Sequence, residues 1–177
     1  MKKVPFILAA AAISVALPAM AQSIGEKTGV NAMTGAAPST QDFVKQAAIS
    51  DMFEIEASKL AQQKGSPEIR AFASRMIEDH SKTTTAIKNM VKNGDVKAEL
   101  PSALDSSHQA KLDKLKTLTG EDFNKNYDES QQAGHKDAVS LFQRYANGGE
   151  NPKLKDFAGK TLPTIQDHQK MAQNLKP

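Results

Sequence analysis

The chain has 177 residues, with 23 Lys plus Arg against 20 Asp plus Glu, and it contains no Cys and no Trp. Without cysteine it cannot form a disulfide, hold zinc or an iron–sulfur cluster through thiolates, use a cysteine nucleophile or carry a lipid on an N-terminal cysteine. The length suits one compact domain.

The first 21 residues have the pattern of a Sec signal peptide. Lys2 and Lys3 precede an apolar run over 4–17, and Ala19-Met20-Ala21 supplies the small residues of a cleavage site after Ala21. The run is too short to predict a retained membrane span. We therefore expect export to the periplasm, with association with the outer membrane left open.

The remaining 156 residues carry 21 basic and 20 acidic side chains, a net charge of about +1. No basic block favours nucleic acid, and no Gly-rich loop favours a nucleotide. Leu, Ile, Val and Phe make up roughly 18% of this part, which is low for a globular domain. Near-zero net charge and many alanines favour a thin helical core over disorder.

The segment 22–39 is predicted to be a flexible linker, because it combines glycines and a proline with no helical or strand periodicity. From residue 40 onward the pattern is helical throughout. The helical pattern is interrupted at Gly65, Gly94, Gly120 and 147–149. A helix cap followed by proline stands at Ser66-Pro67 and again at Asn151-Pro152. Pro163 lies inside the last segment and is expected to kink it. The expected helices are 41–64, 66–93, a shorter amphipathic piece within 100–120, 121–146 and 151–175.

A weak internal repeat relates the two long helix pairs. Ile77-Glu78-Asp79-His80 in the second long helix is matched by Ile165-Gln166-Asp167-His168 in the fourth. A duplicated helix pair joined by a long segment over 94–120 fits a four-helix bundle with one long crossover. We therefore predict an all-α, ferritin-like four-helix bundle over 40–177, with a short extra helix in the crossover.

Three histidines are predicted to face the bundle interior. At 100° per residue, His80 and His168 lie near the middle of the apolar stripes of their helices, and His135 lies toward the edge of its stripe. Glu54 lies on a stripe of small residues. A buried polar group without a partner costs on the order of 1–3 kcal/mol. A divalent metal bound by Glu54, His80, His135 and His168 would satisfy all four, and imidazole ligands suit zinc, copper, nickel or iron.

Further polar residues are candidates to surround this group. His108 projects from the apolar face of the crossover helix, and acidic residues near the histidines could accept their ring N–H groups. Without a metal, these same contacts would form a polar core network. The candidate surrounding residues are Ser58, Asp79, His108, Tyr127, Asp128 and Asp167.

Several blocks of the sequence form a recognisable pattern. They are the block from Phe43 to Glu56, the run Phe72-Ala73-x-x-Met76-Ile77-x-Asp79-His80, and the later Leu100-Pro101, His108, Tyr127, His135 and Leu162-Pro163 with His168. This pattern resembles the exported bacterial domain-of-unknown-function 4142 family. The resemblance covers about 40–175. It implies a ferritin-like four-helix fold in the periplasm or outer envelope, and it implies no established activity.

The candidate ligands differ from those of a di-iron carboxylate centre, which draws on Glu-x-x-His motifs. His80 is preceded two positions earlier by Glu78, and His168 by Gln166. A conventional ferroxidase centre is therefore not predicted, and a single metal in a histidine-rich site fits the residues better.

Three functions stay open at this point. The first is a periplasmic metal-binding or metal-buffering bundle, linked to envelope, oxidative or metal stress. The second is a non-catalytic interaction module with structural histidines, which binds an envelope protein or forms a homo-oligomer. The third is a metal-dependent oxidoreductase, which would need an open coordination position. Classical hydrolase chemistry is not predicted, since the chain has neither a Gly-x-Ser-x-Gly nor a His-Glu-x-x-His motif.

Overall fold

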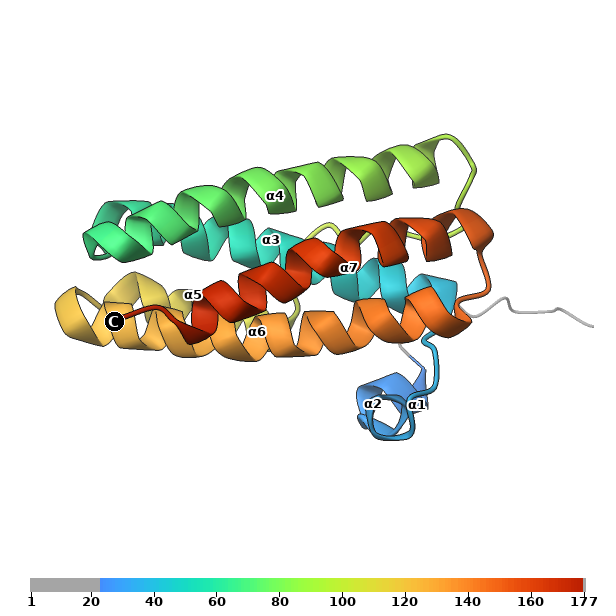
Figure 1. Ribbon diagram of the computed structural model, residues 1–177, viewed down its shortest axis with the longest axis horizontal. Helices are drawn as coiled ribbons and strands as arrows, with labels where there is room; N and C mark the ends of the chain where they lie inside the picture. The colour runs from blue at the N-terminus through green and yellow to red at the C-terminus, as the bar shows by residue number, and fades with distance from the viewer. Residues whose placement is uncertain (1–22, 177) are drawn as a thin grey trace, which may run out of the picture.

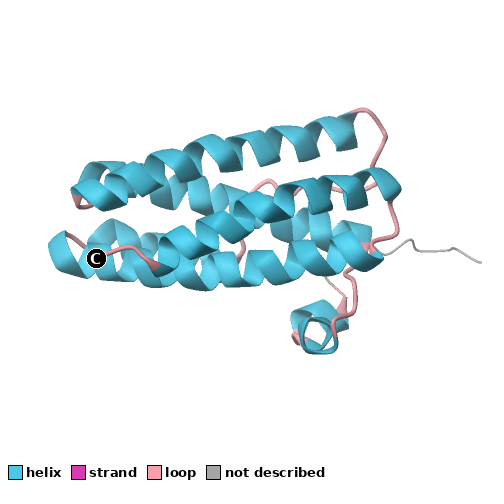
Figure 2. Ribbon diagram, viewed as in Figure 1, coloured by secondary structure: helices cyan, strands magenta, loops and turns pink. Residues whose placement is uncertain are grey.

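The computed structural model describes residues 23–176, so the expected signal peptide lies outside the described residues. Within that range the chain is helical and has no strand (Figures 1 and 2). No helix in this part is both long and apolar enough to cross a membrane. The helices are α1 (Ile24–Lys27), α2 (Val30–Thr34), α3 (Thr40–Lys64), α4 (Pro67–Lys92), α5 (Ser106–Thr117), α6 (Gly120–Gly148) and α7 (Pro152–Gln173).

The four long helices form two hairpins, α3 with α4 and α6 with α7, which pack side by side into a bundle (Figure 1). The connection from α4 to α6 runs back along the bundle and carries α5, which packs on α3 and α6. The predicted all-α bundle with one long crossover is confirmed. Two helix ends differ from the prediction by two residues, since α6 continues through Asn147 to Gly148 and α7 ends at Gln173.

The helix starts follow local chemistry. The side chains of Ser39, Ser66 and Asn151 each accept a hydrogen bond from the backbone N–H three residues later, at the start of α3, α4 and α7. Proline occupies the first position of α4 and α7, where its missing N–H costs nothing. The last helix continues through Pro163 without ending.

The segment 22–39 differs from the expected flexible linker, because its described part holds α1 and α2 and is tied to the bundle. Glu26 forms an ion pair of 2.7 Å with Arg144 of α6, and the Ser23 N–H donates to the Asp42 carboxylate of α3. Gly29 and Gly35 take positive φ angles of 76° and 74° at the ends of α2. The glycines that predicted flexibility therefore serve as helix caps.

The bundle interior is divided into three layers along its length. One apolar cluster includes Phe43, Ile87 and Leu154, and a second includes Phe53 and Phe72. On each long helix, at least one buried polar residue lies between the contributions of that helix to the two clusters, and on α3 Glu54 directly follows Phe53 of the second cluster. These residues form the polar layer, which consists of Asp51, Glu54, His80, Gln131, His135 and His168, all at most 5% exposed.

Candidate metal centre

Three histidines from three different helices meet in the polar layer. His80 lies on α4, His135 on α6 and His168 on α7, and one ring nitrogen from each lies within 4.8 Å of the others. The ring centroids are 5.4 to 5.7 Å apart, so the rings form a nearly equilateral triangle. The three side chains predicted to face inward are therefore brought together.

The positions of these rings follow from the packing around them. His80 lies four residues after Met76, which belongs to the second apolar cluster, and seven before Ile87, which belongs to the first. His135 follows Gly134, where an added Cβ would lie 3.2 Å from Oε1 of Glu54. The missing side chain at Gly134 therefore leaves room for the Glu54 carboxyl beside α6.

One nitrogen of each ring is already fixed by a hydrogen bond. The acceptors are a carboxylate of α3 for His80 Nδ1 (Asp51, 2.8 Å), a backbone carbonyl of α6 for His135 Nδ1 (Gln131, 2.9 Å) and a carboxylate of α4 for His168 Nε2 (Asp79, 3.0 Å). Because carboxylates and carbonyls only accept, each of these ring nitrogens carries the hydrogen in the neutral histidine. The other nitrogen of each ring then offers a lone pair.

These other nitrogens have no protein partner. Nε2 of His80, Nε2 of His135 and Nδ1 of His168 are buried and make no hydrogen bond within the described residues. Buried lone pairs without a donor cost free energy. A cation bound by these nitrogens removes that penalty, and the hydrogen bonds of the other nitrogens are those that metal-bound histidines usually make.

Glu54 and Gln131 lie beside this triangle and are also incompletely paired. Oε2 of Glu54 and both amide atoms of Gln131 are buried with no hydrogen-bond partner in the described residues. Burial raises the pKa of Glu54, against the opposing effects of His80 and the neighbouring Gln131 amide. Glu54 is thus a buried carboxyl at the edge of the group, and the compact three-atom arrangement involves the histidines alone.

The charges favour neutral imidazoles at two of the three positions. Burial and the nearby His80 lower the pKa of His135 to about 4, and burial lowers that of His168 to about 4 despite its bond to Asp79. Burial also disfavours a charged His80, but the bond and charge of Asp51 prevail and raise its pKa. His135 and His168 are therefore ready to act as ligands at neutral pH, whereas His80 holds its second proton more tightly, and a metal must displace that proton.

The geometry fits a transition metal with small adjustments. Separations of at most 4.8 Å put a central point within about 2.8 Å of each nitrogen, while bonds from zinc to imidazole are about 2.0–2.1 Å. Closing on a metal requires each ring to move by less than about 1 Å. The donor set is three imidazoles with one buried carboxyl beside them, which suits zinc, copper, nickel or iron and not calcium or magnesium.

The other predicted residues lie in different places. Asp79 holds His168 as described, and Ser58 forms a buried 2.8 Å hydrogen bond with the Tyr127 hydroxyl. His108 is not brought into the triangle, since its ring packs on Phe53 and its Nδ1 bonds Asp105, the N-cap residue of α5. Nor do the two other carboxylates reach it. Asp128 bonds Gln132, and Asp167 is mostly exposed and pairs with Lys170.

Asp51 and Gln131 are members of the polar layer that the sequence interpretation missed. The Asp51 carboxylate accepts from His80 and from the hydroxyls of Thr83 and Thr84, at 2.7 and 3.0 Å. Asp51 lies three residues before Glu54, so both fall on one face of α3. That spacing was the available signal for Asp51. Gln131, four residues before His135, had the same signal on α6.

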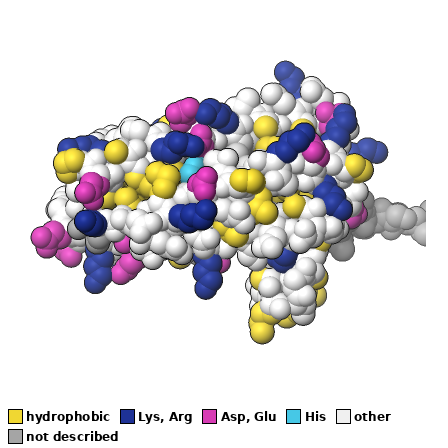
Figure 3. All heavy atoms as spheres, in the orientation of Figure 1, with side chains coloured by type: hydrophobic (Ala, Val, Ile, Leu, Met, Phe, Trp, Pro, Cys, Tyr) yellow, Lys and Arg dark blue, Asp and Glu magenta, His cyan; other side chains and the backbone are white. Residues whose placement is uncertain are grey.

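Basic side chains hold the carboxylate that supports His168. Asp79 forms ion pairs with Arg75 and with Lys82. On the face of the molecule drawn in Figure 3, a histidine lies among acidic and basic side chains. Burial disfavours the charged carboxylate, yet these hydrogen bonds lower the pKa of Asp79 to about 2. The acceptor for His168 is therefore a permanent anion at neutral pH.

Fold and site together define an all-α bundle with a buried cluster of three histidines. The family model described as "Domain of unknown function (DUF4142)" matches residues 25–175, which is most of the chain. The chain belongs to this family, and the match includes the segment that carries α1 and α2. No curated protein and no solved structure matches the chain.

Proposed function

We propose that this protein binds one transition-metal ion through His80, His135 and His168. The observation that carries the proposal is a compact group of three buried histidines, with one ring nitrogen of each within 4.8 Å of the others. Each ring has one buried nitrogen without a hydrogen-bond partner, while its other nitrogen is bonded to an acceptor. Glu54 stands beside the ion as a buried carboxyl that can compensate part of its charge. Binding and storage of the metal require no ligands beyond these residues.

A structural role for the histidines is the second candidate, and one observation favours it. Asp51 raises the pKa of His80, so a protonated His80 could donate from Nε2 to a neighbouring ring and hold the layer together without metal. This arrangement satisfies one lone pair and leaves the remaining buried acceptors unpaired. The metal satisfies all three lone pairs, and we therefore prefer it.

The test is the metal content of residues 22–177, exported into the periplasm and purified without chelator or His-tag. Inductively coupled plasma mass spectrometry should find about one transition metal per chain. The His80→Ala and His168→Ala double variant should contain none, and the matched control His108→Ala should keep the wild-type content. A metal-free wild type that also gains no thermal stability from added zinc, copper, nickel or iron would contradict the proposal and favour structural histidines.

We further propose that the metal is acquired after export, in the periplasm. The support is the leader pattern over 1–21, with a cleavage site after Ala21. Intact-mass measurement of the protein from a periplasmic extract should give the chain beginning at Gln22. A full-length mass, or protein confined to the cytoplasmic fraction, would contradict this part of the proposal.

A further inference from the structure

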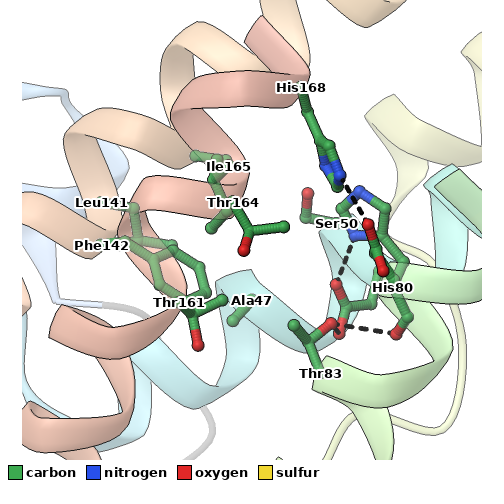
Figure 4. A pocket seen from close by; sticks show the side chains of 13 residues that line it. Ala47, Ser50, His80, Thr83, Leu141, Phe142, Thr161, Thr164, Ile165 and His168 are labelled. Carbon is green, nitrogen blue, oxygen red and sulfur yellow. Dashed lines mark hydrogen bonds and ion pairs between the residues drawn. The ribbon is translucent and has the colours of Figure 1, made fainter. Parts of the chain in front are cut away.

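A small cavity lies against two of the three histidines. His80 and His168 form one side of it, and residues from α3, α6 and α7 close the rest (Figure 4). It leaves about 20 Å³ for the centre of a water molecule, and about 10–15 Å³ is enough to hold one. The cavity is therefore large enough for a water molecule or a ligand of a few atoms, and too small for a larger organic substrate.

The carboxylates that border this cavity cannot supply a further metal ligand. Asp51 is bonded to His80 and to two threonine hydroxyls, and Asp79 is bonded to His168, Arg75 and Lys82. Glu54 does not border the cavity. The residues that border the cavity therefore offer a metal the two histidines and no free carboxylate. Three protein ligands plus one open position is the usual arrangement at a reactive metal.

Three hydroxyl groups border the same space. The side chains of Ser50, Thr161 and Thr164 make no hydrogen bond within residues 23–176. Figure 4 shows Ser50 and Thr164 beside the space next to His80 and His168. Apolar side chains such as Ala47 and Leu141 form the opposite wall. The cavity thus combines free hydrogen-bond donors with an apolar wall, which suits a small polar or diatomic molecule.

From these features we infer that the cavity holds a non-protein ligand of the metal, with no more than about three non-hydrogen atoms. The chemical class is water, dioxygen or a partly reduced form of it, bound end-on to the metal and hydrogen-bonded to the threonine hydroxyls. This inference rests on the proposed metal binding. It adds to that proposal an open coordination position with a size limit.

The experiment uses the mature protein loaded with Co(II), whose visible absorption reports the number and kind of ligands. Azide, a linear three-atom ligand, should change the spectrum and saturate. Imidazole, which is larger than the cavity, should leave the spectrum unchanged at the same concentrations. Bound Co(II) that is insensitive to azide would overturn this inference alone, and so would Co(II) that binds imidazole as readily as azide. Failure to bind Co(II) at all would overturn the proposed function, and the inference with it.

Two neighbouring alanines of α3 provide a matched pair of variants. Ala47 borders this cavity, whereas Ala48 borders a separate hollow near Leu100 and Pro101. Ala47→Leu should weaken azide binding by at least tenfold while Co(II) binding persists, and Ala48→Leu should leave both unchanged. Circular dichroism and thermal melting verify that each variant folds. If Ala47→Leu does not fold, the comparison of azide with imidazole on the unmodified protein decides the question. Equal azide affinity in a folded Ala47→Leu variant would contradict the inference.

Discussion

Two groups of buried polar side chains in this molecule differ in how far the chain itself supplies their hydrogen-bond partners. The Glu26–Arg144 pair, which fixes α1 to α6, finds most of its partners within the chain. Glu26 also accepts from Asn31 and Gln46, and Arg144 also donates to the Ala36 carbonyl, so that only Nε of Arg144 is left without a partner among the described residues. The polar layer has outer partners for its histidines but leaves the inner nitrogens without any. A buried group that finds its partners within the chain serves the fold, while converging unpaired atoms indicate a ligand from outside.

The strongest expected effect is on metal affinity. His80→Ala should weaken binding by roughly 1,000-fold or more, since even loss of an outer hydrogen bond to a ligand typically costs about 10–100-fold. Glu26→Gln should leave the affinity unchanged, because it alters only the self-contained pair. Competition titration with a chromophoric chelator measures both. Equal losses in the two variants would mean that they act through general unfolding.

The outer carboxylates should have the next largest effect. Asp51→Asn and Asp79→Asn each weaken the hydrogen bond that orients a histidine and raises its basicity, so metal affinity should fall by about 10–100-fold. The matched control is Asp105→Asn, which alters the same type of pair at His108 outside the layer. The same titration applies. An Asp105→Asn loss as large as the others would contradict the assignment of the layer.

Breaking the self-contained pair should affect stability instead. Glu26→Ala leaves the mostly buried Arg144 guanidinium without its carboxylate, so the free energy of unfolding should fall by about 1–3 kcal/mol. Urea denaturation followed by circular dichroism measures the change. Unchanged stability would mean that α1 is not docked on α6 in solution.

In the metal-free protein, replacing a histidine of the polar layer with an apolar residue is expected to leave the stability unchanged or to raise it slightly. His135→Leu replaces a buried ring bearing an unpaired nitrogen with an apolar side chain, so the metal-free protein should become no less stable, and up to about 1 kcal/mol more stable. The same change should abolish tight metal binding. His108→Leu, at a partly exposed ring, should stay within about 0.5 kcal/mol of the wild type. A large loss of stability in metal-free His135→Leu would favour structural histidines.

The smallest effect concerns pH. Burial opposes the charged form of Glu26, but hydrogen bonds from Arg144, Gln46 and Asn31 lower its pKa below the ordinary 4.5. The native state then keeps this carboxylate ionised to lower pH than the unfolded chain does. Its stabilising contribution is complete above about pH 4.5 and declines as the pH falls through the lowered pKa.

Urea denaturation of the wild type and Glu26→Gln between pH 7 and pH 3 tests this sign. The difference in unfolding free energy should be largest at neutral pH and should shrink in acid. A difference that grows on acidification would contradict the lowered pKa.

Much of the architecture was predictable, because it depends on short-range sequence patterns. Proline and capping residues mark the starts of α4 and α7, and the 100° periodicity places His80, His135 and His168 inward. Capping residues and periodicity can both be read from one helix at a time. They were therefore enough to predict the helical bundle and the inward direction of the three histidines.

What could not be predicted depends on the register between helices. Whether Asp51 of α3 reaches His80 of α4 is set by how the two helices pack, and no spacing along one helix encodes it. Asp167 was a candidate because it precedes His168, yet one residue is about 100° of helix, which turns it to solvent. The helices α1 and α2 are too short to show a period, and their order comes from the distant Arg144.

X-ray absorption of the zinc-loaded mature protein gives a direct test of metal binding by the three histidines, because outer-sphere scattering from imidazole rings can be counted. We expect about three imidazole ligands with zinc–nitrogen bonds of about 2.0–2.1 Å, reduced in number in His135→Leu and unchanged in His108→Ala. A coordination sphere of oxygen atoms with no imidazole scattering would show that the three buried histidines do not hold the metal.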